Sequence, residues 1–140
     1  MKRSGHGVLV DTGVLVAVFN RSDPQHHAAA AWLARNRAPL LTVEAVLSET
    51  AFFRPARLRA ALAEMASRSV LKVHNPDATG HARMAELFTK YADQDPDWAD
   101  LALVWLAETA GVNQIATLDV ADFSVYRING RRRFEMALLA

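Results

Sequence analysis

Residues 8–13 read Val8-Leu9-Val10-Asp11-Thr12-Gly13, a short apolar run that stops at an acid. Branched apolar residues without polar alternation are typical of a strand that is buried on both faces. Three similar runs follow, at residues 40–42, 70–73 and 114–117, and segments of helical character lie between them. Strands that alternate with helices predict an α/β fold with a mainly parallel sheet.

The intervening helices are indicated by capping residues and by the spacing of apolar residues. The expected helices are Val14 to Phe19, Gln25 to Arg35, about Val43 to Phe53, Pro55 to about Ser67, one capped by Asp77, and Asp97 to Ala110. The last of these is apolar almost all round, so we expect a buried helix in which Glu108 is the main solvent-exposed position. Residues 123–136 are expected to form a hairpin around Asn129-Gly130, because this pair tolerates positive φ twice.

The composition is that of a folded protein. The 140 residues suit one domain, spanning 1–140, and 51% of them are hydrophobic while 22% are charged. The absence of cysteine excludes disulfide scaffolds, thiolate zinc sites and cysteine nucleophiles. The net charge of +1 excludes a histone-like polycation but not a nucleic-acid partner. No apolar run is long enough for a membrane span, and no signal-peptide cleavage site follows the start, so a cytoplasmic location is expected.

Acidic residues fall at the ends of the predicted strands and at the start of the buried helix. Asp11 directly follows the first strand, and Asp119 lies two residues after the fourth. Asp97 and Asp100 occupy the first turn of the buried helix, and Glu49 lies in the helix after the second strand. Because the carboxyl ends of parallel strands line one edge of the sheet, these carboxylates are expected to meet in one cleft.

Carboxylates a few ångströms apart cannot all stay ionised without a counter-charge. Mg²⁺ or Mn²⁺ supplies that charge and prefers oxygen ligands. Such a site suits phosphodiester hydrolysis, in which metal ions activate water and stabilise the attacking and leaving oxygens. For Asp11 taken alone, the alternative is an ordinary helix cap after a strand.

Four blocks of the sequence, in this order, resemble the PIN-domain nucleases and in particular the VapC ribonuclease toxins. They are Val8 to Gly13, Leu41-Thr42 through Leu47-Ser48-Glu49, Asp97 to Leu103, and Ile115 to Phe123. The resemblance implies a three-layer α/β/α PIN-like fold and a metal-dependent ribonuclease that hydrolyses RNA. It also implies a homodimer that is neutralised by a VapB-like antitoxin.

Matched position by position, the family's acidic quartet corresponds to Asp11, Glu49, Asp100 and Asp119. The resemblance makes Asp11 the central ligand of Mg²⁺ or Mn²⁺, with Asp100 and Asp119 completing the site. Glu49 is expected to hold a second metal or a metal-bound water. Many relatives have Asn at the position of Asp119, which suggests that it tunes affinity. Asp97 matches a less regular family position and ranks fifth.

Several neighbouring residues have competing interpretations. Thr12, Thr42 and Thr117 are expected to orient carboxylates or water from a second layer around the metal. Asp122 is interpreted as a cap of the following turn rather than a ligand. Glu44 rivals Glu49 in position, but a carboxylate in a first helical turn is stabilised by the helix dipole whatever the function.

Arginines cluster near the C-terminus, at Arg127, Arg131, Arg132 and Arg133. One interpretation is a solvated, charge-protected edge. The other is that Arg127, Arg131 and Arg133 contact RNA phosphates or an acidic antitoxin segment. Strand alternation would place Arg131 and Arg133 on one face.

Two apolar sets also have two interpretations. Trp98, Leu101 and Trp105 recur at helical spacing, which predicts core positions, although Trp98 at the cleft rim could instead stack on a base. A second set is expected to be mostly core, with a dimer surface as a second use. It comprises Phe52, Phe53, Leu58, Leu62 and Met65.

Two other functions are compatible with parts of this pattern. A phosphoacceptor receiver domain also places acids and Mg²⁺ at strand ends. It requires an acidic pair after its first strand and a late-strand lysine, whereas here Asp11 stands alone and Lys72 is the only strand lysine. The third candidate is a non-catalytic RNA- or antitoxin-binding protein on a PIN scaffold.

Overall fold

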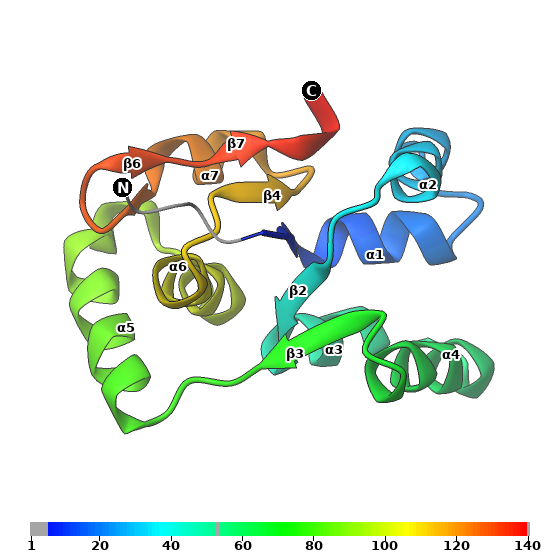
Figure 1. Cartoon of the computed structure of the whole chain (residues 1–140), viewed down its shortest axis with the longest axis horizontal. Helices are drawn as coiled ribbons and strands as arrows, with labels where there is room; N and C mark the ends of the chain where they lie inside the picture. Colours follow the sequence, from blue (N-terminus) through cyan, green and yellow to red (C-terminus); the bar gives the residue numbers. More distant parts are fainter. Residues whose placement is uncertain (1–5, 53, 140) are drawn as a thin grey trace.

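The computed structural model describes residues 6–52 and 54–139, in which a five-stranded sheet forms the centre (Figure 1). The strand order is β3-β2-β1-β4-β7, and every neighbouring pair in this sheet is parallel. The strands are β1 (Val8–Val10), β2 (Leu40–Val43), β3 (Leu71–His74), β4 (Gln114–Ala116) and β7 (Glu135–Met136). The mainly parallel sheet predicted from the sequence is therefore confirmed.

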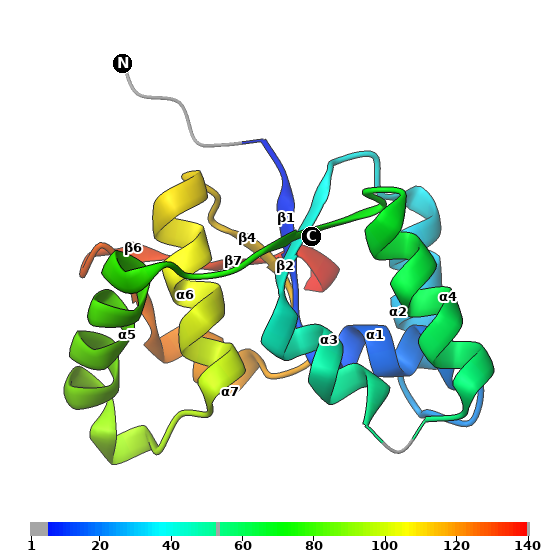
Figure 2. The same ribbon diagram turned by 90° about the horizontal axis from the view of Figure 1, so that it is seen from below.

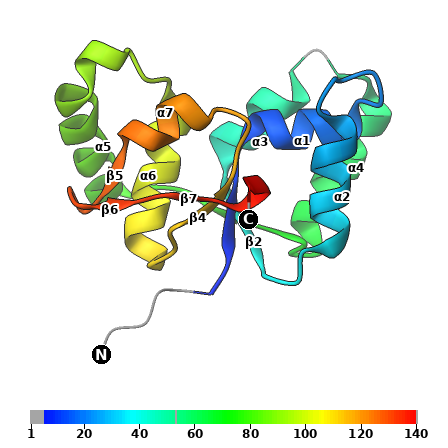
Figure 3. The ribbon, with the colours of Figure 1, turned by 90° about the horizontal axis from the view of Figure 1, so that it is seen from above.

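Helices cover both faces of this sheet. Figures 2 and 3 show α1 to α4 on one side and α5 to α7 on the other, which confirms the three-layer α/β/α arrangement. The α-helices are α1 (Thr12–Phe19), α2 (His26–Arg35), α3 (Glu44–Ala51), α4 (Ala56–Ser67), α5 (Ala78–Lys90), α6 (Trp98–Ala110) and α7 (Val120–Val125), and the short 3₁₀ helices are η1 (Ala92–Gln94) and η2 (Ala137–Leu139). Within the described residues, no helix has the length and apolar character needed to cross a membrane.

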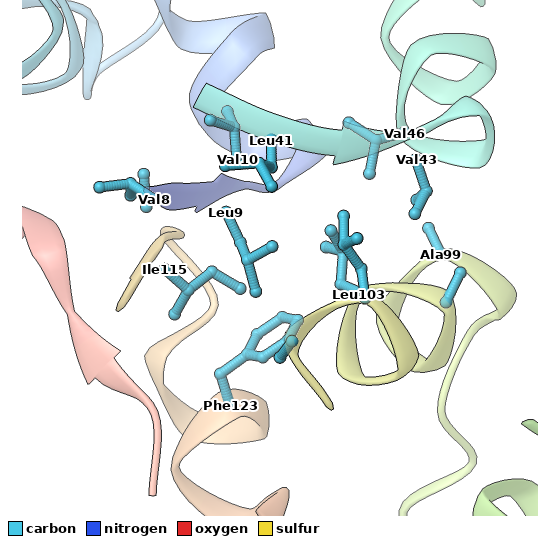
Figure 4. Packing of buried hydrophobic residues seen from close by; sticks show 14 of the residues in the cluster. Val8, Leu9, Val10, Leu41, Val43, Val46, Ala99, Leu103, Ile115 and Phe123 are labelled. Atoms are coloured by element: carbon cyan, nitrogen blue, oxygen red, sulfur yellow. The ribbon is translucent and has the colours of Figure 1, made fainter. Parts of the chain in front are cut away.

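The core lies where the central strands meet α6. All three residues of β1 are buried, as expected for a strand covered on both faces. Figure 4 shows Leu9 of β1 and Ile115 of β4 next to Leu103 of α6 and Phe123 of α7. All four side chains are fully buried. The almost wholly apolar sequence of α6 is thus explained by its position against the sheet.

Four helices begin at an aspartate that caps them, and three of these aspartates, Asp11, Asp97 and Asp119, lie at the same edge of the sheet. Asp11 accepts a hydrogen bond from the backbone N–H of Thr12 at 2.8 Å, and Asp97 accepts one from the N–H of Asp100 at 2.8 Å. Asp119 accepts a longer bond from the N–H of Asp122, at 3.4 Å. Asp11 and Asp119 lie where a strand leads into a helix and Asp97 lies at the start of α6, so the three caps fix their carboxylates beside one another.

For the hairpin expected over residues 123–136, the turn is confirmed but the two long strands on either side of it are wrong. The turn is present, with φ of 53° at Asn129 and 74° at Gly130. It joins only the two-residue strands β5 (Arg127–Ile128) and β6 (Arg132–Arg133), which pair antiparallel. The preceding residues form α7, because Asp119 caps this segment, and Glu135–Met136 leaves the hairpin to pair with β4.

The expectation that Glu108 is exposed is also wrong, since only 9% of its side chain is accessible. Its carboxylate accepts two hydrogen bonds from the Arg83 guanidinium, at 2.8 and 2.9 Å. It accepts a third from the backbone N–H of Asn129, at 2.7 Å. Helix α5 and the β5–β6 turn cover this side of α6, so Glu108 ties three elements together.

Candidate functional site

The five predicted acids meet in one cleft of about 380 Å³ at the carboxyl ends of β1 and β4. In Figure 2, β1 runs directly into α1 at this end of the sheet. The cleft is lined by Asp11, Thr12, Gly13, Glu49, Asp97, Asp100, Leu118 and Asp119. No lysine or arginine belongs to this lining among the described residues. The sheet topology therefore brings negative charges together without a positive side chain between them.

Asp11 is held rigidly at the base of the cleft. It is 7% exposed, and its backbone N–H donates to the carbonyl of Ala116 in β4 at 3.0 Å. Its Oδ1 accepts from the N–H of Thr12, and its Oδ2 accepts from the hydroxyl of Thr117 at 2.9 Å. Burial raises the pKa of Asp11 to about 6, and the charges of Asp97 and Asp119 act in the same direction against these two hydrogen bonds.

Asp100 is also buried, in the first turn of α6. Burial raises the pKa of Asp100 to about 8, and the charges of Asp97 and Asp11 add to this effect. The hydroxyl of Tyr126 donates to Oδ2 of Asp100 at 3.0 Å and lowers the pKa, but less strongly than burial raises it. Both buried carboxylates of the cleft are thus held in surroundings that disfavour their charge.

Hydroxyl groups connect the remaining acids. The Thr12 hydroxyl donates to Oε1 of Glu49 at 2.7 Å, which joins α1 to α3 across the cleft. The Thr117 hydroxyl, which donates to Asp11, also accepts from the backbone N–H of Asp119 at 2.9 Å. Thr42 is different, because its hydroxyl donates to the carbonyl of Val10 at 2.8 Å and not to a carboxylate.

Asp122 lies closer to the site than its interpretation as a cap implied. Helix α7 starts directly after Asp119, so Asp119 is the cap and Asp122 falls in the first turn. Asp100, Asp119 and Asp122 each offer a carboxylate oxygen within 4.8 Å of the others, a spacing that a metal ion could bridge. A hydrogen bond with Asp119 raises the pKa of Asp122. Asp122 is therefore a further candidate ligand.

Tyr126 is the site residue that sequence reasoning missed. It is fully buried, and its ring packs edge-on against Tyr91 and Phe123, with centroid distances of 5.1 and 5.2 Å. Burial and the adjacent Asp100 raise the pKa of Tyr126, so its hydroxyl stays a hydrogen-bond donor. The only signal in the sequence is general, namely that a buried tyrosine hydroxyl requires a partner.

The structure places the arginine cluster away from the cleft. The Arg127 guanidinium donates to the backbone carbonyls of residues 124–126, at 2.7, 3.0 and 3.1 Å, and so closes the end of α7. Arg131 lies in the turn and Arg133 in β6, and both are exposed. Along the chain, α7 lies between Asp119 and these arginines. None of these three arginines lines the cleft.

The core interpretation of the Trp98 spacing is correct for Leu101 but wrong for Trp98. Leu101 is fully buried and Trp105 is partly buried, whereas Trp98 is 56% exposed. As the first residue of α6, Trp98 lies at the end of the helix that emerges from the core beside the cleft. The alternative interpretation, in which Trp98 is exposed beside the cleft, is therefore the correct one.

The apolar set around α3 and α4 is only partly core. Leu62 is buried, and Leu58 and Met65 are half-buried. Phe52 is 65% exposed, and Phe53 lies outside the described residues. This region therefore retains apolar surface beside the core.

Comparisons with known proteins agree with this architecture. Residues 8–128 match the family model described as PIN domain. The chain is 30% identical over 132 residues to Ribonuclease VapC26 of Mycobacterium tuberculosis, an alignment that covers 91% of this chain and 97% of that protein. Its fold is similar to the crystal structure of Mycobacterium tuberculosis VapC20, a toxin described as cleaving the sarcin–ricin loop. The TM-score is 0.74 at 19% identity, over 81% of this chain and 91% of that one.

Proposed function

The chain belongs to the PIN domain family, and we propose that it is a divalent-metal-dependent endoribonuclease that hydrolyses RNA phosphodiester bonds. The observation that carries the proposal is the cleft in which five carboxylates converge, with no lysine or arginine of residues 6–52 and 54–139 in its lining. The likeness to Ribonuclease VapC26 supports RNA as the substrate.

The residues of the cleft fit a divalent cation. The charged groups that line it, within the part of the chain that the structure describes, are carboxylates, and oxygen ligands are those that Mg²⁺ and Mn²⁺ prefer. The pKa values of Asp11 and Asp100 are raised by burial and by neighbouring negative charge. A cation between these carboxylates would offset both effects, because it favours their ionised form.

Asp11, Asp100 and Asp119 are proposed to hold this cation, with Asp97 or Asp122 as additional ligands, and Glu49 to hold a second cation or a water. When bound, the cation supplies activation of water and stabilisation of charge on the phosphate oxygens. The chain's own residues position these ligands. Thr117 fixes one oxygen of Asp11, and the Asp97 cap holds the backbone of Asp100 in place.

Cleavage of a structured RNA in the presence of Mg²⁺ or Mn²⁺ tests the proposal. Asp11→Asn keeps the hydrogen-bonding shape of the side chain but removes its charge, so we expect a loss of cleavage of roughly 100-fold or more. Asp93→Asn is the matched control, because Asp93 is exposed in η1 and lies outside the cleft lining, and it should cleave normally. Undiminished cleavage by Asp11→Asn, or by the wild type in excess EDTA, would refute the assignment.

A separate calorimetric titration with Mn²⁺ tests the alternative function. A chain that binds no Mn²⁺ would be a binding protein on a PIN scaffold.

We further infer that the protein acts as the toxin of a VapBC-type pair, as a homodimer neutralised by a VapB-like antitoxin. The likeness to Ribonuclease VapC26 supports the pairing, and the exposed Phe52 supports a subunit contact. Expression of the chain should arrest growth, and co-expression of a cognate VapB-like antitoxin should restore growth. Light scattering should give the mass of a dimer. Growth arrest by Asp11→Asn equal to that of the wild type would contradict toxicity by cleavage.

A further inference from the structure

Trp98 presents a fixed aromatic ring to solvent beside the acidic cleft. Its indole packs against two rings of α5, with centroid distances of 6.1 Å to His81 and 5.8 Å to Phe88. More than half of the residue nevertheless remains exposed, at 56%. An aromatic ring that packs against protein on one face and is exposed to solvent on the other can stack on a flat ligand.

Trp98 forms one wall of a groove of about 340 Å³, which is separate from the acidic cleft. The polar lining of this groove consists of Glu44 and Ser48 from α3, Asn75 from the loop after β3, and His81 from α5. The Oδ1 atom of Asn75 accepts a hydrogen bond from the backbone N–H of Glu44 at 3.3 Å, so the loop is attached to α3. The groove therefore combines the Trp98 ring with a carboxylate, a hydroxyl, an amide and the imidazole of His81.

The groove and the acidic cleft adjoin because α3 and α6 line both. Ser48 lines the groove while the next residue, Glu49, lines the cleft. In the same way, Trp98 lines the groove and the preceding residue, Asp97, lines the cleft. Figure 2 shows α6 between α5 and α3, which is the arrangement that creates this pair of neighbouring sites. A polymeric ligand with one residue bound in the acidic cleft could therefore place an adjacent residue in the groove.

We propose that this groove is a subsite for one unpaired nucleotide of the substrate RNA, next to the phosphate that is hydrolysed. The inference rests on the proposed function, since it requires RNA in the cleft. The base stacks on the indole of Trp98, and its polar edge meets Glu44, Ser48 and Asn75, with the His81 ring packed beside Trp98. Proteins recognise single-stranded RNA by this combination of aromatic stacking and hydrogen bonds to base edges.

The chemistry of the polar lining predicts a preference among bases. The Glu44 carboxylate only accepts hydrogen bonds, so it favours a base that carries an amino group. Adenine, cytosine and guanine carry one, whereas uracil does not. The same carboxylate argues against a second subunit as the occupant, because charged residues are depleted from the cores of protein interfaces.

Binding can be measured without cleavage, using the full-length Asp11→Asn chain and a single-stranded RNA that carries 2-aminopurine at successive positions. Stacking on Trp98 should lower the 2-aminopurine fluorescence at one position. Trp98→Ala should abolish this decrease and weaken binding roughly 5- to 150-fold, whereas Trp98→Phe should retain most of both, since phenylalanine also offers a stacking face. Unchanged affinity and unchanged fluorescence in Trp98→Ala would overturn the subsite.

Uridine at the same position should weaken binding to the parent chain, and Glu44→Gln should reduce this discrimination, because an amide can also donate to uracil. Equal discrimination against uridine by Glu44→Gln and by the parent chain would overturn the role of Glu44.

A lower mass of Trp98→Ala in light scattering, with RNA binding unchanged, would place Trp98 in a subunit interface and overturn the subsite. A decrease in fluorescence that depends on Trp98, in a chain whose wild type cleaves no RNA, would refute the proposed hydrolysis but not the subsite. Normal cleavage and normal RNA binding by Trp98→Ala would refute the subsite but not the proposed hydrolysis.

Discussion

Asp100 is the residue in which the requirements of folding and of the proposed activity conflict most directly. Burial, and then the charges of Asp97 and Asp11, raise the pKa of Asp100 from 3.8 to about 8. Folding therefore raises the pKa above its value in the unfolded chain, so the folded state binds the additional proton between these two values. The stability of the metal-free protein is accordingly expected to fall as the pH rises through this range.

Asp100→Asn should consequently stabilise the metal-free protein at pH 8, by about 1–3 kcal/mol, while it removes a proposed metal ligand. The asparagine cannot ionise, and its amide oxygen can still accept the hydrogen bond from Tyr126. At pH 5 the carboxyl is protonated in the folded protein and only part of the loss has accumulated, so the variant should gain less than at pH 8. Urea unfolding in EDTA at both pH values measures the difference. Asp93→Asn, at an exposed acid, should change stability at neither, and an Asp100→Asn chain that is less stable than the wild type at pH 8 would contradict the argument.

At the scale of secondary structure, the elements that could be predicted are those specified by their own sequence. The fully apolar β1 and the capped, apolar α6 are examples, and the structure places both within a residue or two of the prediction. Helix α7 was missed because its six residues include two branched valines, which locally favour a strand. Its helical form depends on the Asp119 cap and on burial of Phe123, which only the assembled core supplies.

The acids of the cleft could be predicted from the sequence, whereas the role of Tyr126 could not, because it depends on how the elements pack. The acids could be predicted because parallel strands bring their carboxyl ends to one edge, whatever the details of packing. Tyr126 contacts Asp100 only because α7 folds back over α6, a contact between segments 26 residues apart. No local pattern specifies this approach. The position of Trp98 at the rim likewise depends on where α6 leaves the core.

The contacts of Glu108 lead to a prediction about how the elements hold together. Glu108→Gln should destabilise the protein by about 2–3 kcal/mol, because it leaves Arg83 and the N–H of Asn129 with a weaker partner in a largely buried position. Glu86→Gln is the matched control, since Glu86 pairs with the same Arg83 but its side chain is 70% exposed. Its effect should stay below about 0.5 kcal/mol. Equal losses in urea unfolding would show that burial of Glu108 contributes nothing.

For the whole molecule, the net charge of +1 conceals a separation of charge. Five acids face one cleft, while Arg127, Arg131 and Arg133 lie beyond the far end of α7. Among the described residues, no lysine or arginine lines the cleft in which this negative charge is concentrated. A ligand that supplies positive charge in the cleft should therefore act on the stability of the entire fold.

Mn²⁺ should accordingly raise the melting temperature of the protein, and it should do so more at pH 8 than at pH 5.5. A ligand that binds only the folded state adds about 2.7 kcal/mol at 100 times its dissociation constant. Protons compete for the same oxygens, because burial raises the pKa of Asp11 to about 6 and that of Asp100 to about 8. At pH 5.5 both carboxyls are mainly protonated, so the same Mn²⁺ concentration should add much less. Thermal unfolding across a Mn²⁺ titration at the two pH values measures this coupling, with Asp100→Asn as the variant that should lose it at both. Equal stabilisation at both pH values, or full stabilisation of Asp100→Asn, would mean that the metal binds elsewhere than between these two buried carboxylates.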